Sequence, residues 1–282
     1  MDNESTSCAT PGDVERAQQD RMIENNLGRI KRKILVMSGK GGVGKSTIAA
    51  YLALRLSLKG KRVGLLDVDL HGPSIPRLLD VQGGFDAPEE EGGVRPYRHS
   101  ENLGIVSLEM VLEDKDAAVI WRGPLKISAI RQFISDIDWG DLDYLIVDAP
   151  PGTGDEPLTV AQTIPDAEAL IVTTPQEISL ADVRKSINFC RQVEMKILGL
   201  VENMSRFVCP HCGKATPIFG SGGGTQVAAQ MKIPLIAEIP IDPQMVALGD
   251  NGRLDTLLEK SDIPINNAYD QIVNMILGLP SW

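Results

Sequence analysis

A lysine and a hydroxyl group stand at the end of a glycine run, in the spacing that binds the phosphates of a nucleotide. The run covers residues 39–47 and reads Gly-Lys-Gly-Gly-Val-Gly-Lys-Ser-Thr. Glycines let successive backbone N–H groups turn inward toward phosphate oxygens. Lys45 can reach the β- and γ-phosphates, and the Ser46 hydroxyl can join the shell of a Mg²⁺ ion. The candidate nucleotide contacts are Gly39, Gly41, Gly42, Val43, Gly44, Lys45, Ser46 and Thr47.

The segments on either side of this run fit a phosphate-binding loop. Residues 34–37 are apolar, as in a buried strand, and residues 48–54 contain no helix breaker. A helix that starts at the loop adds the positive end of its dipole to the phosphate site. The alternative is a glycine-rich turn that merely joins a strand to a helix. The complete pattern in this context favours a nucleotide-binding protein.

Aspartates follow two further apolar runs. Asp67 and Asp69 lie at the end of a strand predicted over residues 63–68, and Asp148 ends the apolar run 144–147. Because ligands bind at the carboxyl ends of parallel strands, we expect these carboxylates beside the phosphate loop. Asp148 is expected to hold Mg²⁺ through a water molecule. For Asp67 and Asp69 the alternative is a pair of caps for the next helix.

Residues at the ends of two later strands are candidates for the base pocket. Asn203 ends a strand predicted over residues 197–203, and an asparagine can both donate to and accept from one edge of a purine. Pro240 and Asp242 follow a strand predicted over residues 235–239. No guanine-recognition signature of the form Asn/Thr-Lys-x-Asp occurs. The alternative for Asn203 is a cap at the end of its strand.

A pair of cysteines forms the second specific pattern. Cys209 and Cys212 are separated by two residues, a spacing that presents both sulfurs to one metal. The pair supplies two ligands, whereas Zn²⁺ or a cubane iron–sulfur cluster takes four. Cys8 falls in a polar terminal segment and Cys190 in a predicted helix, so neither is a natural third ligand. Two chains related by a twofold axis would supply all four thiolates.

Other interpretations of the cysteine pair remain open. A structural zinc site shared by two chains has the same spacing. A redox dithiol is less favoured because the pair lies in a glycine-flanked loop and not at a helix N-terminus, which would lower the pKa of a thiol.

The motifs together resemble one family. Lys40 is a second lysine that an ordinary phosphate loop does not need, and Gly-Pro-Ser at 72–74 follows the Asp-x-Asp at 67–69. With the cysteine pair, the chain from Lys33 to its last predicted helix resembles the Mrp/ApbC-type iron–sulfur cluster carriers. These belong to the deviant phosphate-loop ATPases, with MinD, ParA and the nitrogenase iron protein.

The resemblance implies a homodimeric ATPase that uses ATP and Mg²⁺. It implies that Lys40 reaches the nucleotide of the other subunit, although a solvated loop lysine is the alternative. It implies that Cys209 and Cys212 bind a [4Fe–4S] cluster at the dimer interface, for transfer to apo iron–sulfur proteins. Asp69 would orient the attacking water, and Asn203 would contact adenine. The implied catalytic residues are Lys40, Lys45 and Asp69, and the implied magnesium ligands are Ser46, Asp67 and Asp148.

Composition restricts the partners. The 282 residues carry a formal net charge of −10, which argues against a nucleic-acid partner. No apolar run approaches the ~20 residues that a membrane span needs. Four cysteines in a chain without a recognisable secretory signal predict reduced thiols and a cytoplasmic location. A MinD-like membrane regulator, the main rival, should end in a basic amphipathic helix, but no Lys or Arg follows Lys260.

Strand and helix patterns alternate along the chain, which predicts an α/β fold with a mostly parallel, doubly wound sheet. We expect a flexible N-terminal tail over residues 1–28, with a short helix possible at 13–25. Residues 29–282 are expected to form one ATPase domain with a cysteine loop near 206–221. No arginine finger is recognisable, so we expect slow basal ATP hydrolysis. The remaining expected strands are 34–38, 103–108, 142–147 and 169–173, and the expected helices are 46–57, 124–134, 180–192, 225–231 and 266–277.

Overall fold

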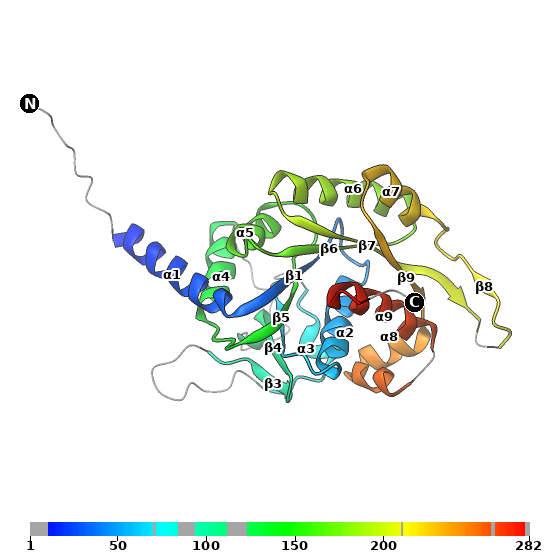
Figure 1. The fold of residues 1–282 in the computed structure, drawn as a ribbon, viewed down its shortest axis with the longest axis horizontal. Helices are drawn as coiled ribbons and strands as arrows, with labels where there is room; N and C mark the ends of the chain where they lie inside the picture. The colour runs from blue at the N-terminus through cyan, green and yellow to red at the C-terminus, as the bar shows by residue number, and fades with distance from the viewer. Residues whose placement is uncertain are drawn as a thin grey trace, which may run out of the picture.

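A mostly parallel sheet with helices on both faces forms the centre of the protein in a computed structural model (Figure 1). The structure describes residues 11–69, 72–83, 94–111, 123–209, 211–260 and 263–279. Within them the sheet has nine strands, in the order β3-β4-β2-β5-β1-β6-β7-β8, with β9 also paired to β7. The α/β, doubly wound architecture expected from the alternating pattern is confirmed.

Parallel pairing joins the long strands, and antiparallel pairing adds a short strand at two places. The parallel strands are β1 (Ile30–Ser38), β2 (Val63–Asp67), β4 (Leu103–Ser107), β5 (Leu142–Asp148), β6 (Glu168–Thr173), β7 (Lys196–Val208) and β9 (Leu235–Ile241). The antiparallel additions are β3 (Tyr97–Ser100), on β4, and β8 (Ala215–Thr216), on β7.

Helices connect these strands. Those in the described residues are α1 (Pro11–Gly28), α2 (Lys45–Leu58), α3 (Ile75–Leu78), α4 (Gly123–Asp136), α5 (Asp155–Thr163), α6 (Glu177–Gln192), α7 (Gly223–Met231), α8 (Pro243–Asp250) and α9 (Pro264–Leu277), with 3₁₀ turns at Leu108–Val111 and Leu254–Glu259. The five helices expected from the sequence are all present, each within a few residues of its expected bounds. In the described residues, no helix combines the length and the apolar character that crossing a membrane requires.

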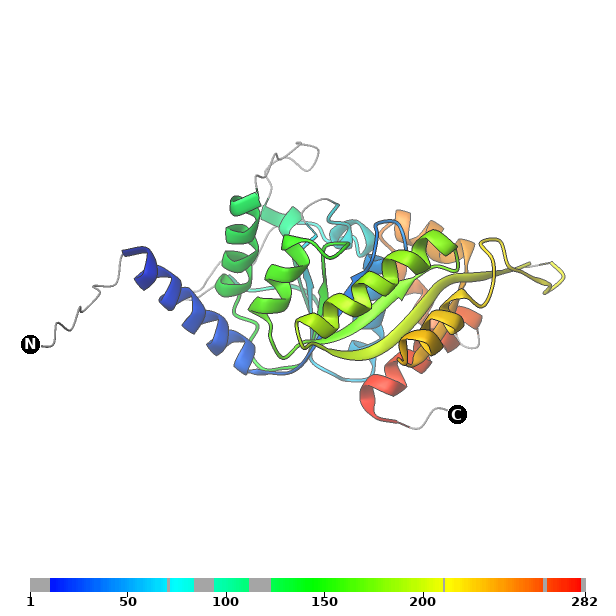
Figure 2. The same ribbon diagram turned by 90° about the horizontal axis from the view of Figure 1, so that it is seen from above.

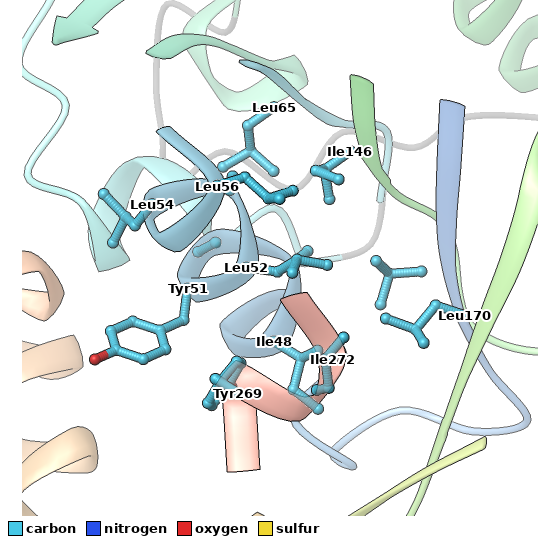
Figure 3. Close-up of a cluster of buried hydrophobic side chains, with 14 of the residues drawn as sticks. Ile48, Tyr51, Leu52, Leu54, Leu56, Leu65, Ile146, Leu170, Tyr269 and Ile272 are labelled. Carbon is cyan, nitrogen blue, oxygen red and sulfur yellow. The ribbon is translucent and has the colours of Figure 1, made fainter. Parts of the chain in front are cut away.

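The sheet separates two apolar cores, and β1 contributes to both. Ile34 and Val36 face one core, which contains α2 and α9, while Leu35 and Met37 face the other, which contains α4, α5, α6 and α7. This alternation follows from the two-residue period of a strand that is buried on both faces. Figure 3 shows the first core, where Ile48 of α2 lies beside Ile272 of α9.

Part of the segment expected to be a flexible tail is a helix. Helix α1 covers residues 11–28, and its Ile23 and Leu27 are buried in the same core as α4. The side-chain amide of Asn26 also donates to the carbonyl oxygen of Ser135, at 2.8 Å. Ile23 and Leu27 lie one helical turn apart, so they share a face, but two apolar residues in a polar segment are a weak signal. Residues 1–10, with Cys8, lie outside the described residues.

Strand β7 is longer than the sequence indicated. It was expected to end at Asn203, but it continues to Val208, where Phe207 and Val208 pair with β8. The strand therefore reaches directly to Cys209. Its extension depends on a partner strand that comes later in the chain, so the local pattern did not reveal it.

Candidate nucleotide site and thiol knuckle

The phosphate loop lies between the end of β1 and the start of α2, as expected. Gly42 and Gly44 have φ angles of 77° and 84°, in the left-handed region that favours glycine. A Cβ on Gly44 would also collide with the side-chain amide of Asn203. These two positions therefore need glycine for backbone conformation, and Gly44 also for space.

A cleft of about 390 Å³ opens at this loop and collects most of the predicted nucleotide contacts. Its described lining is Ser38, Lys40, Gly41, Gly42, Gly44, Lys45, Ser46, Thr47, Asp69, Gly72, Ser74 and Pro151. Val43 belongs to the loop, but its side chain is buried in the core with α2. Gly39 packs against α6, where a Cβ would lie 2.5 Å from the carbonyl carbon of Asp182.

Lys45 is buried among carboxylates. Its Nζ lies 2.6 Å from Asp148 Oδ1 and 3.5 Å from Asp69 Oδ2. The sheet produces this grouping, because β2 and β5 are adjacent and parallel and end together, with Asp67 directly opposite Asp148. Burial lowers the pKa of Lys45, but Asp148 and Asp69 outweigh it and the pKa lies above its usual value. The ammonium group is therefore charged at neutral pH and available to a phosphate.

Asp67 holds the chain that comes after β2. Its carboxylate is fully buried and accepts hydrogen bonds from the backbone N–H of Asp69, at 3.1 Å, and of Ile75, at 3.4 Å. It also accepts from the Ser107 hydroxyl at 3.1 Å. Burial, together with the nearby charge of Asp148, raises the pKa of Asp67 to about 8. These contacts hold the backbone that carries Asp69, and the predicted place of Asp67 beside Mg²⁺ stays a prediction.

The surroundings of Asp148 fit a hard cation such as Mg²⁺. Asp148 is completely buried, and its Oδ2 has no hydrogen-bond partner among the described residues. Burial raises the pKa of Asp148, while Lys45 and the Ser46 hydroxyl oppose that effect. An orphaned carboxylate oxygen beside a hydroxyl is the oxygen donor set that Mg²⁺ prefers. Ser46 and Asp148 are therefore the residues that would hold the ion.

Lys40 lies at the rim of the cleft. Its side chain is half-buried, and none of the ion pairs between described residues includes its ammonium group. The Ser38 hydroxyl donates to the carbonyl oxygen of Lys40, at 2.9 Å, which fixes the backbone there. The side chain is thus attached to an ordered loop, with its charge unpaired within the described part of the chain.

The three residues predicted to contact the base are not among the described residues that line the cleft. The Asn203 side-chain amide donates to the carbonyl oxygen of Val43, at 2.8 Å, and so holds the phosphate loop. The Asp242 carboxylate accepts from the N–H of Gln244, at 2.8 Å, and caps α8. Pro240 is buried at the end of β9. Base contact therefore stays a prediction for all three.

The thiol knuckle, defined as the described residues Cys209 and 211–214, lies at the far end of β7. In Figures 1 and 2 the strand and its hairpin partner β8 extend away from the body of the protein. The N–H of Cys209 donates to Lys214 O at 3.0 Å, and the N–H of Gly213 donates to Cys209 O at 2.9 Å. Gly213 has a φ of 68°, which permits this tight turn.

The two knuckle thiols are free and accessible. Cys209 is half-buried and Cys212 is exposed. Backbone N–H groups of Cys212 and His211 hold the pKa of the Cys209 thiol below its usual value. Thiolates are the form that binds soft metals and iron–sulfur clusters. The knuckle therefore presents a ready pair of ligands on the surface.

One chain supplies only these two sulfurs in the part that the structure describes. No group of three or more His, Cys, Asp or Glu side chains there is placed to hold a metal ion. Cys190 is buried in α6 beside Met37, and burial raises the pKa of its thiol to about 11. Cys190 is therefore an inert core residue, as its helical position suggested.

Comparison with known proteins shows the family to which the chain belongs. The family model for the NUBPL iron-transfer P-loop NTPase, of the ParA group, matches residues 29–277. An iron–sulfur cluster carrier protein from Methanocaldococcus jannaschii is 45% identical over 262 residues, which are 93% of this chain and 89% of that protein. The cytosolic Fe-S cluster assembly factor NUBP2 of Bos taurus is 46% identical over 257 residues, 90% of this chain and 94% of that protein.

Solved structures show the same architecture. A nucleotide-binding protein from Archaeoglobus fulgidus, in complex with ADP, has a TM-score of 0.75 and 40% identity, and the match covers 88% of this chain and 95% of that one. The cell division ATPase MinD of Pyrococcus furiosus has a TM-score of 0.62 and 23% identity, covering 89% of this chain and 100% of that one, a likeness of fold alone.

Proposed function

This chain belongs to the NUBPL iron-transfer P-loop NTPase family, and from that premise we propose that it is an ATP-dependent iron–sulfur cluster carrier. Two chains hold a [4Fe–4S] cluster as cargo at their interface and pass it to apo iron–sulfur proteins, in the cytoplasm. The observation that carries the proposal is the accessible Cys209–Cys212 pair, half of a four-thiolate site, which begins directly after the strand that contacts the phosphate loop.

The chain's own residues support ATP hydrolysis in defined roles. Lys45 places a buried ammonium group where the loop receives phosphate oxygens, and Asp69, 3.5 Å from it, orients the attacking water. Lys40 extends from the rim and neutralises charge on the nucleotide of the second chain. A Mg²⁺ ion held by Ser46 and Asp148 supplies further positive charge against the phosphates. We expect slow turnover, because no arginine is among the described residues that line the cleft.

A half site on each chain supports the homodimer. The knuckle provides two thiolates, and a cubane cluster takes four. A twofold axis through the knuckle supplies the missing pair from an identical chain. Relatives from an archaeon and a mammal are named as an iron–sulfur cluster carrier and a cytosolic Fe-S cluster assembly factor, which supports the same cargo here.

The rival is a MinD-like regulator with a structural zinc at the cysteine pair. A membrane-binding regulator needs an amphipathic helix with a free apolar face. The apolar residues of α9, including Ile272, Val273 and Ile276, are instead buried against the sheet. Asp270 of α9 pairs with Arg55 of α2. The geometry of the last helix therefore favours the carrier.

A visible absorption spectrum tests the proposal. Protein purified without oxygen, or reconstituted anaerobically with iron and sulfide, is expected to be brown, with about four irons per dimer. Thiolate-bound iron and sulfide absorb visible light, whereas zinc is colourless. A colourless protein that carries stoichiometric zinc and takes up no iron would contradict the carrier function and support the rival.

The Asp69→Asn variant tests the hydrolytic role. Asparagine keeps the size of the side chain but loses the charge that orients water, so we expect hydrolysis to fall about 10²- to 10⁴-fold. Nucleotide affinity should stay within about threefold, because Lys45 and the loop amides remain. Phosphate release and titration with a fluorescent ATP analogue measure the two quantities. Undiminished hydrolysis in Asp69→Asn would remove this residue from the mechanism.

A further inference from the structure

Two neighbouring residues of β7 hold two different loops. The side-chain amide of Asn203 donates to the carbonyl oxygen of Val43 in the phosphate loop, at 2.8 Å. The Glu202 carboxylate accepts the backbone N–H of Gly224, where the chain returning from the thiol knuckle enters α7. Adjacent residues of a strand point to opposite faces. One short piece of β7 therefore joins the nucleotide site to the segment that carries the cysteines.

Glu202 is unusual because it is a buried carboxylate without a cation. It is 1% exposed, and no ion pair among the described residues includes it. Its oxygen is directed at the N-terminus of α7, where the helix dipole favours negative charge. A Cβ on Gly224 would lie 2.6 Å from Glu202 Oε2, so the close approach needs glycine. Burial raises the pKa of the Glu202 carboxyl, and the hydrogen bond from the Gly224 N–H opposes that rise.

Helix α6 contacts the same two loops. A Cβ on Gly39 of the phosphate loop would lie 2.5 Å from the Asp182 carbonyl carbon, and a Cβ on Gly223 would lie 2.6 Å from Leu180 Cδ1. The phosphate loop and the return from the knuckle are thus both packed, through glycines, on the first turns of α6. Two elements, β7 and α6, therefore contact both the phosphate loop and the segment that returns from the knuckle.

The strand between these contacts and the cysteines is irregular. Met204 has a φ of 57°, in the left-handed region that a side chain seldom adopts. The register of β7 with β9 also shifts between Asn203 and Phe207. Such irregularities bend a strand and change the direction of its later residues. The direction in which β7 approaches Cys209 therefore depends on the backbone just after residues 202–203.

We propose that Glu202 is a positioning residue that couples nucleotide occupancy of the phosphate loop to the hold of the thiol knuckle on its cargo. Nucleotide changes the contact of Val43 with Asn203, β7 and α6 transmit the change, and the Glu202–Gly224 bond passes it to the return segment of the knuckle. This inference rests on the proposed carrier function and assigns its regulation to a specific contact. It predicts that replacing Glu202 changes the effect of nucleotide on cluster retention, but changes neither nucleotide binding nor cluster binding measured separately.

The first test compares the rate of cluster loss to an iron chelator with and without a non-hydrolysable ATP analogue. In the unchanged chain we expect nucleotide to alter this rate at least about fivefold, a usual size for coupled sites. In Glu202→Ala the ratio should fall to within about twofold of one, while iron content and nucleotide affinity stay within about twofold of the unchanged chain.

Two further variants separate positioning from general damage. Glu202→Gln keeps an oxygen that can accept from Gly224, so it should retain at least half of the nucleotide effect. Glu238→Gln is the electrostatic control, because Glu238 pairs with Glu202 in register on β9 and acts on its carboxylate through charge, but its side chain is 37% exposed and contacts Arg206. The control should keep the full ratio. If Glu202→Ala does not fold, Gly224→Ala, which separates the same two groups, takes its place.

Several results would overturn the inference. The first is that nucleotide does not change the rate of cluster loss from the loaded, unchanged chain. The second is that Glu202→Ala keeps the full ratio of the two rates. The third is that Glu202→Gln retains none of the nucleotide effect. Hydrogen exchange on the unchanged chain, which needs no cluster, is the second measurement. ADP should change the protection of the peptide that contains Gly224, and an unaltered peptide would refute the coupling. A chain that never takes up iron contradicts the carrier function instead, and the exchange result then decides the coupling alone.

Discussion

Replacement of Lys45 by alanine is expected to lower nucleotide affinity at least about 100-fold and to abolish measurable hydrolysis. The reason is that Lys45 Nζ is the one buried cation that the described residues place beside Asp148 and Asp69. Charge-assisted contacts to a phosphate are worth about 1.5–3 kcal/mol each in ground-state binding. Removing a preorganised donor to transition-state charge costs about 10²- to 10³-fold more in rate. Calorimetric titration with ATP and a phosphate-release assay measure both effects.

Cluster loading should survive this change, because the knuckle follows the end of β7 and neither of its cysteines is among the described residues that line the nucleotide cleft. Lys59→Ala is the control, since Lys59 is exposed at the end of α2 and should behave as the unchanged chain. Circular dichroism should show that the variant is folded, because Asp148 can take up a proton when its partner is lost. A Lys45→Ala chain that hydrolyses ATP at the original rate would contradict the role of the loop.

Removal of either knuckle cysteine is expected to abolish cluster binding. Cys209→Ala and Cys212→Ala each leave two thiolates in a dimer where a cubane cluster takes about four. Iron after anaerobic reconstitution should therefore fall from about four per dimer to a background below about one-tenth of that value. Compared with the cluster-free unchanged chain, nucleotide affinity and basal hydrolysis should stay within about twofold, because neither thiol lines the nucleotide cleft.

Cys190→Ala provides the matched control for the thiol variants. It removes the same chemical group, but from a buried position in α6 where burial raises the pKa of the thiol to about 11. Iron loading should be unchanged, with only the modest loss of stability expected for a shortened core residue. Equal iron loss in Cys190→Ala and Cys209→Ala would show that the knuckle is not the specific ligand.

The phosphate loop and the central strands could be predicted because their signals are local. Glycines at 42 and 44 adopt the positive φ angles that such a loop needs, and the apolar run of β1 is explained by burial on both faces. Asp148 was correctly expected beside Lys45, since both come after strands that end at the same edge of a parallel sheet.

Other features depend on partners far away in the chain. The bond from Ser107 to Asp67 and the bond from Gly224 to Glu202 join residues 40 and 22 positions apart, and no local pattern marks them. Asp67 ends the apolar strand β2, and Glu202 interrupts the apolar run of β7. A polar residue in a buried strand was therefore the available signal. The extension of β7 toward Cys209 likewise depends on pairing with β8. Sequence periodicity describes one segment at a time and does not report such pairings.

Native mass spectrometry of the reconstituted protein, kept free of oxygen, tests the shared cluster most directly. The mass should correspond to two chains plus one [4Fe–4S] unit, and the Cys209→Ala chain should lose that unit. Iron bound stoichiometrically to a single chain, or a dimer that excludes iron while both knuckle thiols are free, would contradict the shared cluster.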